Sequence, residues 1–544
     1  MSSKTSPLVR FWNLINQYKK EIKLIYYYAV ISGVVNLSLP LGIQAIINYL
    51  QTGEFTTSWV VLVVFVLIGI AISGVIQINQ LRIVEDIQQD IFAKSAFEFT
   101  YRIPKIKQLH LDKLHAPELV NRFFDVLTIQ KGLPKILIDF SLAAFQIIFG
   151  LVLLTFYSSY FIILGLSLVL IMFLIFKITG PKGLETSIKE SKYKYMLAHW
   201  IEEVASNTRT FKILNKGNLH LEKADDINLN YLQSREKHFK ILIKQFIMFI
   251  GFKVWVAAAL LVLGGYLVFH QEMNIGQFVA SEIIIILIIN SVEKIIRIVE
   301  TIYDVLTALD KIGYVTDLGL DVNDSHGDID ISNGVSIEAK ELCFKYPEQS
   351  SYLFYDLSFK IKPHAKVCLK GKTGSGKTTL LNILSRIRNI EKGELLFNNR
   401  PSDFYNLDTF NTHIGLITHK TGLFEGTIEE NILLNRTIDK ENLKEILDVL
   451  HLSDYISSLK DGIKTKIDSQ GRRTPMSTAQ KIILARVLVN NPQLLLLEDP
   501  LQFIDEDEKN NIIDYIMSPN KPWTVVVIAD YQYWAQKSNQ IIKL

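Results

Sequence analysis

An uninterrupted phosphate-binding pattern stands in the second half of the chain. Residues 371–378 read Gly-Lys-Thr-Gly-Ser-Gly-Lys-Thr, which matches G-x-x-x-x-G-K-[ST] in full. The glycines let backbone N–H groups converge on an anion, the Lys377 ammonium reaches terminal phosphates, and the Thr378 hydroxyl suits Mg²⁺. The residues expected to contact a nucleotide in this loop are Gly371, Lys372, Thr373, Gly374, Ser375, Gly376, Lys377, Thr378 and Thr379.

The residues on either side of this loop supply the context that the pattern requires. An apolar strand is expected at 367–369, and an apolar helix is expected from Thr379 onward. A helix that begins at the loop would present its positive end to the phosphates. The sequence therefore predicts a nucleotide site with Mg²⁺.

Composition divides the chain into two kinds of domain. Its 544 residues are too many for a single hydrophobic core, so at least two domains are expected. Hydrophobic residues make up 49% of the chain, and the mean hydropathy is +0.21. A net charge of +3 does not favour a nucleic-acid partner. The two cysteines, Cys343 and Cys368, are interpreted as buried thiols rather than a disulfide framework.

The first half contains six segments long and apolar enough to cross a membrane. Lys and Arg are absent from the three short loops expected outside and abundant in the long loops expected inside, which places both termini and the second domain in the cytoplasm. In a bacterial cell this is the inner (plasma) membrane. The predicted spans are 24–48, 58–79, 135–156, 159–179, 245–270 and 275–297.

Charged residues within these spans include Asp139, Lys253 and Glu282. Asp139 and Glu282 lie near predicted span starts, which favours contact with headgroups over a substrate path. Lys253 lies deeper, and the two interpretations of it stay open. Residues 1–20 suit an interfacial helix. The predicted domains are a membrane domain at 1–318, a polar acidic linker at 319–334 and a nucleotide-binding domain at 335–544.

Further landmarks of the chain resemble those of ATP-binding cassette (ABC) exporter halves, in which a six-helix membrane domain is fused to an α/β phosphate-loop ATPase. Tyr346 stands where that family stacks an aromatic ring on adenine. Residues 414–417 and 423–432, Arg486 and Asp505 follow the family spacing. Among such exporters the chain looks most similar to the hemolysin and bacteriocin secretion type. The resemblance implies ATP and Mg²⁺ as ligands and a dimer, with itself or with a second half.

Four departures from the family pattern fall at catalytic positions. His419 replaces a glutamine, Glu498-Asp499 replaces Asp-Glu, and Asp530 replaces the histidine before the last helix. Residues 474–478, Thr-Pro-Met-Ser-Thr, replace the signature Leu-Ser-Gly-Gly-Gln. The family motif thus assigns catalytic positions to Glu498, Asp499, His419 and Asp530, and metal binding to Thr378 and Glu498.

Each departure has a physical consequence. Glu498 still offers a carboxylate to Mg²⁺. Asp499 is one methylene short for a base that must reach water, and misplacement of a general base costs on the order of 10²–10⁴ in rate. Asp530 sets an anion near the terminal phosphate, and Pro475 removes an N–H donor from the signature. The sequence predicts retained ATP binding with impaired hydrolysis.

Three functions remain open at this point. The first is a subunit of an exporter whose complete partner half hydrolyses most of the ATP, with a periplasmic adaptor as a further possible partner. The second is a membrane regulator that binds ATP without transporting. The third is a slow homodimeric exporter in which Asp499 acts as base. The cargo is not indicated.

Overall fold

The computed structural model describes residues 5–52, 57–114, 116–214, 217–321, 325, 327, 334–347 and 349–544. Contacts within the chain group into two compact units. One comprises Met1–Ile106 with Leu111–Gly319, and the other comprises Lys107–His110 with Leu320–Leu544. Most of the predicted linker 319–334 lies outside the described residues.

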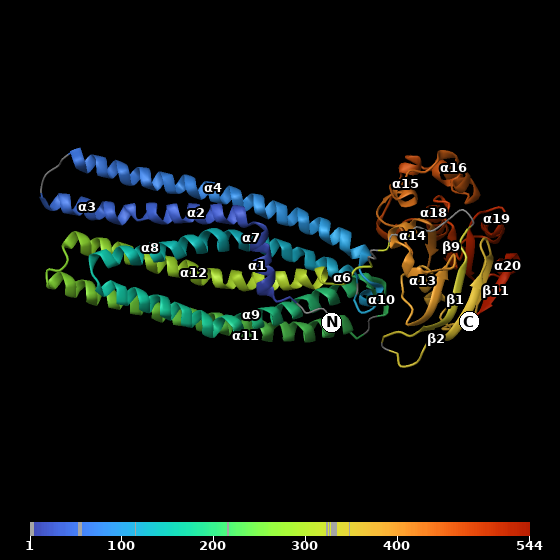
Figure 1. Cartoon of the computed structure of the whole chain (residues 1–544), viewed down its shortest axis with the longest axis horizontal. Coiled ribbons are helices and arrows are strands. Elements are labelled where there is room, and N and C mark those ends of the chain that lie inside the picture. Colours follow the sequence, from blue (N-terminus) through green and yellow to red (C-terminus); the bar gives the residue numbers. More distant parts are fainter. Residues whose placement is uncertain are drawn as a thin grey trace. The chain divides into compact units, whose positions relative to one another are not determined.

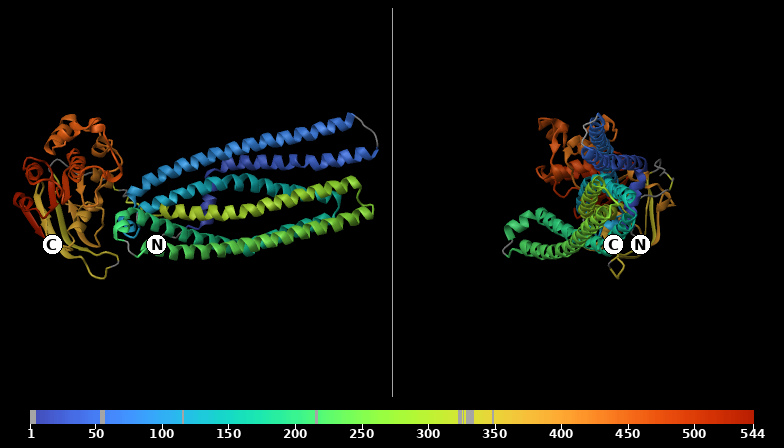
Figure 2. Two further views of the ribbon diagram at one scale, coloured as in Figure 1. Left: turned by 180° about the vertical axis from the view of Figure 1, so that it is seen from behind. Right: turned by 90° about the vertical axis from the view of Figure 1, so that its left-hand side faces the viewer.

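The first unit is a bundle of long helices that run side by side (Figures 1 and 2). Six helical segments in the described residues are long and apolar enough to span a membrane: Lys19–Tyr49, Thr57–Lys105, Ala116–Tyr157, Tyr160–Ser206, Leu219–Phe269 and Ile275–Thr316. Each corresponds to one predicted span to within one residue or contains it, and all but the first continue well beyond it. The predicted spans fall in α2 (Lys19–Asn36), α3 (Ser38–Thr52), α4 (Thr57–Arg102), the π-helix η3 (Lys135–Phe140), α8 (Ser141–Tyr157), α9 (Tyr160–Ser206), α11 (Leu219–Phe269) and α12 (Ile275–Thr316). The other helices of the unit are α1 (Pro7–Gln17), η1 (Ile103–Lys105), α5 (Gln108–Leu111), α6 (Ala116–Asn121), η2 (Arg122–Phe124), α7 (Asp125–Pro134) and α10 (Thr208–Leu214).

The first span is interrupted between α2 and α3. Pro40 has no N–H, and its ring opposes the carbonyl of residue 36, so the helix ends at Asn36 and restarts at Ser38. Side chains of α2 and α4 meet at this break. The Ser73 hydroxyl bonds the Asn36 side-chain oxygen at 3.0 Å and the Ser32 hydroxyl at 3.1 Å. By contrast, Gly264 and Gly265 do not interrupt α11.

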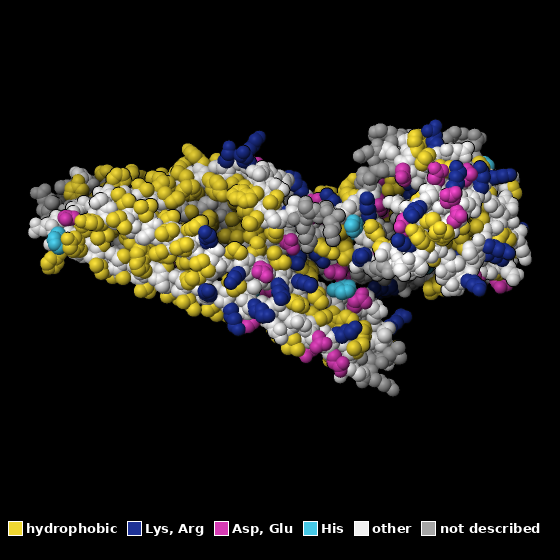
Figure 3. Space-filling view, turned by 60° about the horizontal axis from the view of Figure 1, so that its bottom comes forward, with side chains coloured by type: hydrophobic (Ala, Val, Ile, Leu, Met, Phe, Trp, Pro, Cys, Tyr) yellow, Lys and Arg dark blue, Asp and Glu magenta, His cyan; other side chains and the backbone are white. Residues whose placement is uncertain are grey.

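The surface of this unit separates apolar from charged regions. On the face drawn in Figure 3, hydrophobic side chains cover one end of the bundle, and charged side chains gather toward its other end. Exposed apolar side chains such as Val61, Phe65 and Leu166 lie in the predicted spans. A surface of this kind suits contact with lipid.

The second unit is built around a parallel five-stranded sheet in the order β11-β3-β10-β9-β6. A four-stranded antiparallel sheet (β2-β1-β4-β5) and the pair β7-β8 accompany it. The strands are β1 (Ile337–Phe344), β2 (Phe354–Ile361), β3 (Lys366–Lys370), β4 (Lys392–Phe397), β5 (Arg400–Pro401), β6 (Ile414–Ile417), β7 (Gly426–Thr427), β8 (Lys466–Ile467), β9 (Leu494–Glu498), β10 (Thr524–Ile528) and β11 (Gln540–Lys543).

Helices pack against these sheets and close two apolar cores. One core joins β1, β2 and β4 to the helix after β3, and the other joins β9 and β10 to the helices that follow residue 428. The central strands β9 and β10 are apolar almost throughout because both faces of the sheet are covered. The helices are α13 (Lys377–Leu384), η4 (Ser402–Phe404), α14 (Leu407–Thr412), α15 (Ile428–Leu433), α16 (Lys440–Val449), α17 (Ser453–Ser458), η5 (Gly462–Lys464), η6 (Ser469–Gly471), α18 (Met476–Leu488), α19 (Glu506–Met517) and α20 (Gln532–Lys537).

Candidate functional site

The phosphate loop connects β3 to α13 at the carboxyl edge of the parallel sheet. The helix begins at Lys377, two residues earlier than the predicted Thr379. Gly374 and Gly376 adopt φ of 84° and 94°, which favour glycine. A Cβ on Gly376 would also lie 2.6 Å from the Phe354 ring. At Gly376, both the backbone conformation and the close packing therefore require glycine, whereas at Gly374 only the conformation favours it.

Two polar side chains of the loop are available to a phosphate. Lys377 Nζ donates to the carbonyls of Gly371 and Lys372 at 2.8 and 3.1 Å. Ser375 Oγ is buried and has no hydrogen-bond partner among the described residues. A hydroxyl left unpaired in this way is a donor for a ligand oxygen. The loop thus fits a phosphate group.

Three residues predicted to handle Mg²⁺ and water are brought together beside the loop. Thr378 Oγ1 donates to Glu498 Oε1 at the end of β9. The other oxygen of that carboxylate contacts His419, from the ring Nδ1 at 3.1 Å and from the backbone N–H at 3.3 Å. Thr378 and Glu498 are therefore placed to share one cation, with His419 at its rim.

Asp499 and Asp530 follow neighbouring strands at the same edge. Ile528 of β10 pairs with Glu498 of β9, and the Asp499 N–H donates to the Ile528 carbonyl at 2.8 Å. Asp499 has a positive φ of 40°. Neighbouring protein atoms that displace its water, and then the charge of Asp530, raise the pKa of Asp499 above its usual value. The two carboxylates therefore lie near each other.

Tyr346 reaches the loop helix from the segment after β1. Its hydroxyl bonds the Thr379 hydroxyl at 2.8 Å, and the Arg388 guanidinium lies 4.8 Å from the centre of its ring. Thr379 is buried, so its hydroxyl is engaged by Tyr346. Tyr346 is thus joined to the first turn of α13.

The segment in place of the family signature starts helix α18 without a side-chain cap. Pro475 occupies the N-cap position, and Met476 follows with 61% of its surface exposed. Sequence reasoning missed Gln480, one turn further on. Its Nε2 donates to the Asp499 carbonyl at 3.1 Å, and its Oε1 accepts from the Phe503 N–H at 2.9 Å. Gln480 ties α18 to the residues that follow β9.

Arg486 anchors the other end of α18. Its guanidinium donates to the Gly422 carbonyl at 2.9 Å, and to the Asn431 carbonyl and side-chain oxygen at 2.7 and 3.0 Å. Burial lowers the pKa of Arg486 below its ordinary value. The spacing marked Arg486 as a landmark, but its role in holding the segment between β6 and α15 emerges only from the fold.

One of the charged residues predicted within the spans is paired. Lys253 Nζ on α11 lies 2.5 Å from Glu293 on α12, and Glu293 also bonds Arg297 at 2.6 Å. The charge of Lys253 is thus offset by Glu293 within the bundle. Asp139 lies in η3, and Glu282 lies in α12.

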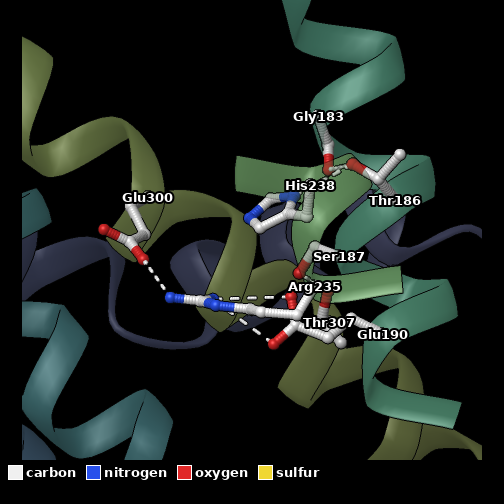
Figure 4. Close-up of polar contacts among 8 residues, drawn as sticks. All are labelled: Gly183, Thr186, Ser187, Glu190, Arg235, His238, Glu300 and Thr307. Atoms are coloured by element: carbon white, nitrogen blue, oxygen red, sulfur yellow. Dashed lines mark hydrogen bonds and ion pairs between the residues drawn. The ribbon is translucent and has the colours of Figure 1, made fainter. Parts of the chain in front are cut away.

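A larger polar group of the first unit escaped sequence reasoning. Arg235 on α11 extends between Glu190 on α9, at 3.3 Å, and Glu300 on α12, at 3.6 Å (Figure 4). We call these three residues the arginine bridge. The buried His238 bonds Thr186 at 2.9 Å, and Ser187 bonds Thr307 at 2.9 Å. These contacts join three helices beyond the predicted spans.

The two units each match a protein-family model. Residues 24–292 match the ABC transporter transmembrane region, and residues 354–502 match the ABC transporter family. The chain is therefore a multi-pass membrane protein in which a six-helix ABC exporter domain is followed by a phosphate-loop ABC ATPase domain. This confirms the predicted fold class. An ABC ATPase domain implies ATP binding.

Over the regions that align, about a quarter of the residues are identical between the chain and its curated relatives. A putative export ATP-binding/permease protein of Rickettsia bellii is 26% identical over 70% of this chain and 66% of its own length. A probable multidrug resistance ABC transporter ATP-binding/permease protein of Bacillus subtilis, YheI, is 28% identical over 49% of this chain and 46% of its own. The match spans less than two thirds of each relative's length.

A solved structure shares the fold along nearly the whole chain. It is described as a bacterial Atm1-family ABC exporter with ATP bound, and it superposes with a TM-score of 0.83 at 16% identity. The superposition covers 97% of this chain and 93% of the other. This likeness concerns the fold alone.

Proposed function

We propose that the chain is the ATP-binding and permease subunit of an exporter that binds Mg-ATP but hydrolyses it slowly. The observation that carries the proposal is the contrast at one sheet edge. The phosphate loop has its glycines, Lys377 and an unpaired Ser375 hydroxyl, whereas the catalytic positions beside it hold Asp499 and Asp530. The names of the curated relatives support export as the activity.

The residues of this edge take distinct parts. The loop N–H groups and Lys377 bind the phosphates, and Tyr346 receives the base. Thr378 and Glu498 hold Mg²⁺, whose chemistry is to neutralise phosphate charge. His419 and Asp499 are the groups near enough to orient a water. Asp499 lacks the reach of glutamate, so hydrolysis at this edge is slow.

We further propose a dimer in the inner membrane, with both termini and the ATPase unit in the cytoplasm, because the basic residues gather in the predicted inner loops. A second, catalytically complete half is the partner that supplies turnover. In that arrangement the partner's phosphate loop faces this chain's Pro475 and Met476. The site that supplies turnover then has complete catalytic groups but lacks one N–H donor of the signature. A hemolysin-type branch and a periplasmic adaptor remain parts of this proposal.

The test is Mg-ATP hydrolysis by the purified full-length chain in lipid nanodiscs, with nucleotide binding measured on the same sample. Binding with phosphate release far below that of a complete exporter is the expected result. Lys377→Ala is the control for both readings. Brisk hydrolysis that Lys377→Ala removes would contradict the impaired site and favour a homodimeric exporter.

A regulator that binds ATP without transporting is the second candidate, because the same altered positions Asp499, Asp530 and Pro475 suit it. Co-expression with a complete half separates the two. An exporter subunit co-purifies with that half and changes its hydrolysis rate. A regulator leaves that rate unchanged and responds to nucleotide without a partner.

A further inference from the structure

The strand order gives Asp530 a central place at the edge that carries the phosphate loop. Strand β10 lies between β3 and β9, and all three run parallel. Val527 pairs with Cys368 on one side and with Leu497 on the other. The chain therefore leaves β10 between the loop, which begins at Gly371, and Glu498. Asp530 comes two residues after the end of this strand and is exposed.

Acidic groups accumulate around this position. Glu498 is engaged by Thr378 and His419. The Asp530 charge is one of the causes that raise the pKa of Asp499, after displacement of water by protein atoms. Lys377 acts in the opposite direction on the same carboxyl. Three carboxylates thus stand at the edge from which the Lys377 ammonium reaches toward phosphate.

The first two phosphates of a nucleotide and the third meet different surroundings here. Loop N–H groups and the start of α13 surround the inner phosphates with donors. A third phosphate that extends toward the ends of β9 and β10 would add negative charge on the side of Asp530. At an effective dielectric of about 20, two like charges ~6 Å apart oppose binding by roughly a hundredfold, and the exposure of Asp530 to solvent reduces this to about tenfold.

We propose that Asp530 sets the nucleotide preference of this chain, so that the phosphate loop holds a nucleoside diphosphate at least as firmly as the triphosphate. The inference rests on the proposed function insofar as the loop is the nucleotide site. It goes further in naming the state in which the subunit rests. Mg²⁺ favours the triphosphate, because the cation at Thr378 and Glu498 offsets part of the repulsion.

The experiment measures dissociation constants of ADP and ATP for the full-length protein in nanodiscs. Displacement of a fluorescent nucleotide in the cold gives both constants, with Mg²⁺ and with EDTA. In the wild type, ADP is expected to bind as tightly as ATP or more tightly. Asp530→Asn keeps the shape and removes the charge. It should tighten ATP by about tenfold and change ADP by less than about twofold.

Asp461→Asn is the matched control, because Asp461 is an exposed aspartate beside the short turn η5 rather than at the sheet edge. It should leave both constants unchanged. A wild type that prefers ATP by tenfold, or an Asp530→Asn variant that shifts both nucleotides equally, would overturn the inference. The wild-type ratio decides even where the variant fails to fold.

The same samples separate this inference from the function on which it rests. If Lys377→Ala leaves both nucleotides bound, the loop is not the site and both proposals fail. If the chain hydrolyses ATP briskly yet still prefers ADP, only the proposed slow hydrolysis fails. If hydrolysis is slow and ATP is preferred, only the inference about Asp530 fails.

Discussion

The arginine bridge and the sheet edge treat charge in opposite ways. In the bridge, one guanidinium lies between two carboxylates from different helices. At the edge, displacement of water and then the charges of Asp530 and Glu498 raise the pKa of Asp499, whereas the charge of Lys377 lowers it. Opposite charges offset each other within the protein, whereas clustered carboxylates are stabilised by a bound cation or by taking up a proton. The bridge is therefore a structural ion pair, and the sheet edge is suited to bind a cation together with its ligand.

Lys377→Ala removes the cation that the edge itself supplies, and it should have the largest effect. A charged donor to phosphate contributes about 1.5–3 kcal/mol, so binding should weaken by about a hundredfold and be lost at micromolar nucleotide. Equilibrium binding to the purified full-length chain checks this. Unchanged affinity would show that the nucleotide binds elsewhere.

Gly183→Ala tests whether the polar contacts around the bridge depend on close packing. A Cβ there would lie 2.4 Å from Tyr303 Cζ, and the Tyr303 hydroxyl accepts from Gln245 at 2.8 Å. Overpacking of this kind costs about 1–3 kcal/mol. The melting temperature in nanodiscs should fall.

Gly180→Ala is the matched control for that substitution. Gly180 lies three residues earlier on the same helix, and a Cβ there meets no atom within 4 Å. Equal melting temperatures for the two variants would mean that Tyr303 moves freely and that the packing around the bridge is loose.

Arg235→Gln removes the bridge itself, and its effect should be smaller. The Arg235 side chain is 43% exposed and that of Glu300 is 48% exposed, so solvent screens this pair, whereas Glu190 is 16% exposed and is screened less. A loss of about 1 kcal/mol or less is expected. Lys240→Gln on the same helix, at a side chain 71% exposed, gives the baseline in the same melting assay. A loss well above this would assign the bridge a function beyond pairing.

Asp499→Glu should have the smallest effect, which is a gain in hydrolysis of no more than about threefold. The extra methylene leaves Asp530 and Pro475 unchanged. A general base contributes a rate factor of about 10²–10⁴ only where the other catalytic groups are also in place. Phosphate release by the purified chain is the measurement. A hundredfold gain would show that Asp499 alone limits the rate. The negative charge of Asp530 at the sheet edge would then have little effect on hydrolysis.

Local patterns were sufficient for much of this molecule. Hydrophobic runs located the six spans, and the glycines with Lys377 identified the loop. The clustering of Thr378, His419 and Glu498 depends on which strands are neighbours, which no local pattern shows. The arginine bridge could not be predicted from the sequence, because Glu190, Arg235 and Glu300 lie on three helices whose relative register is set by packing. The family resemblance supplied the positions at the sheet edge, and the fold supplied Gln480.

The break in the first span bears on how the protein is made. The segments α2 and α3 have 18 and 15 residues, which correspond to about 27 and 22 Å of helix. Neither alone crosses a hydrocarbon core of about 30 Å. The polar side chain that meets Asn36 at the break is Ser73, and the ribosome adds it only later in synthesis. The first span is therefore synthesised before the side chain that bonds Asn36, and the hydrogen bond at the break forms only after α4 has followed it.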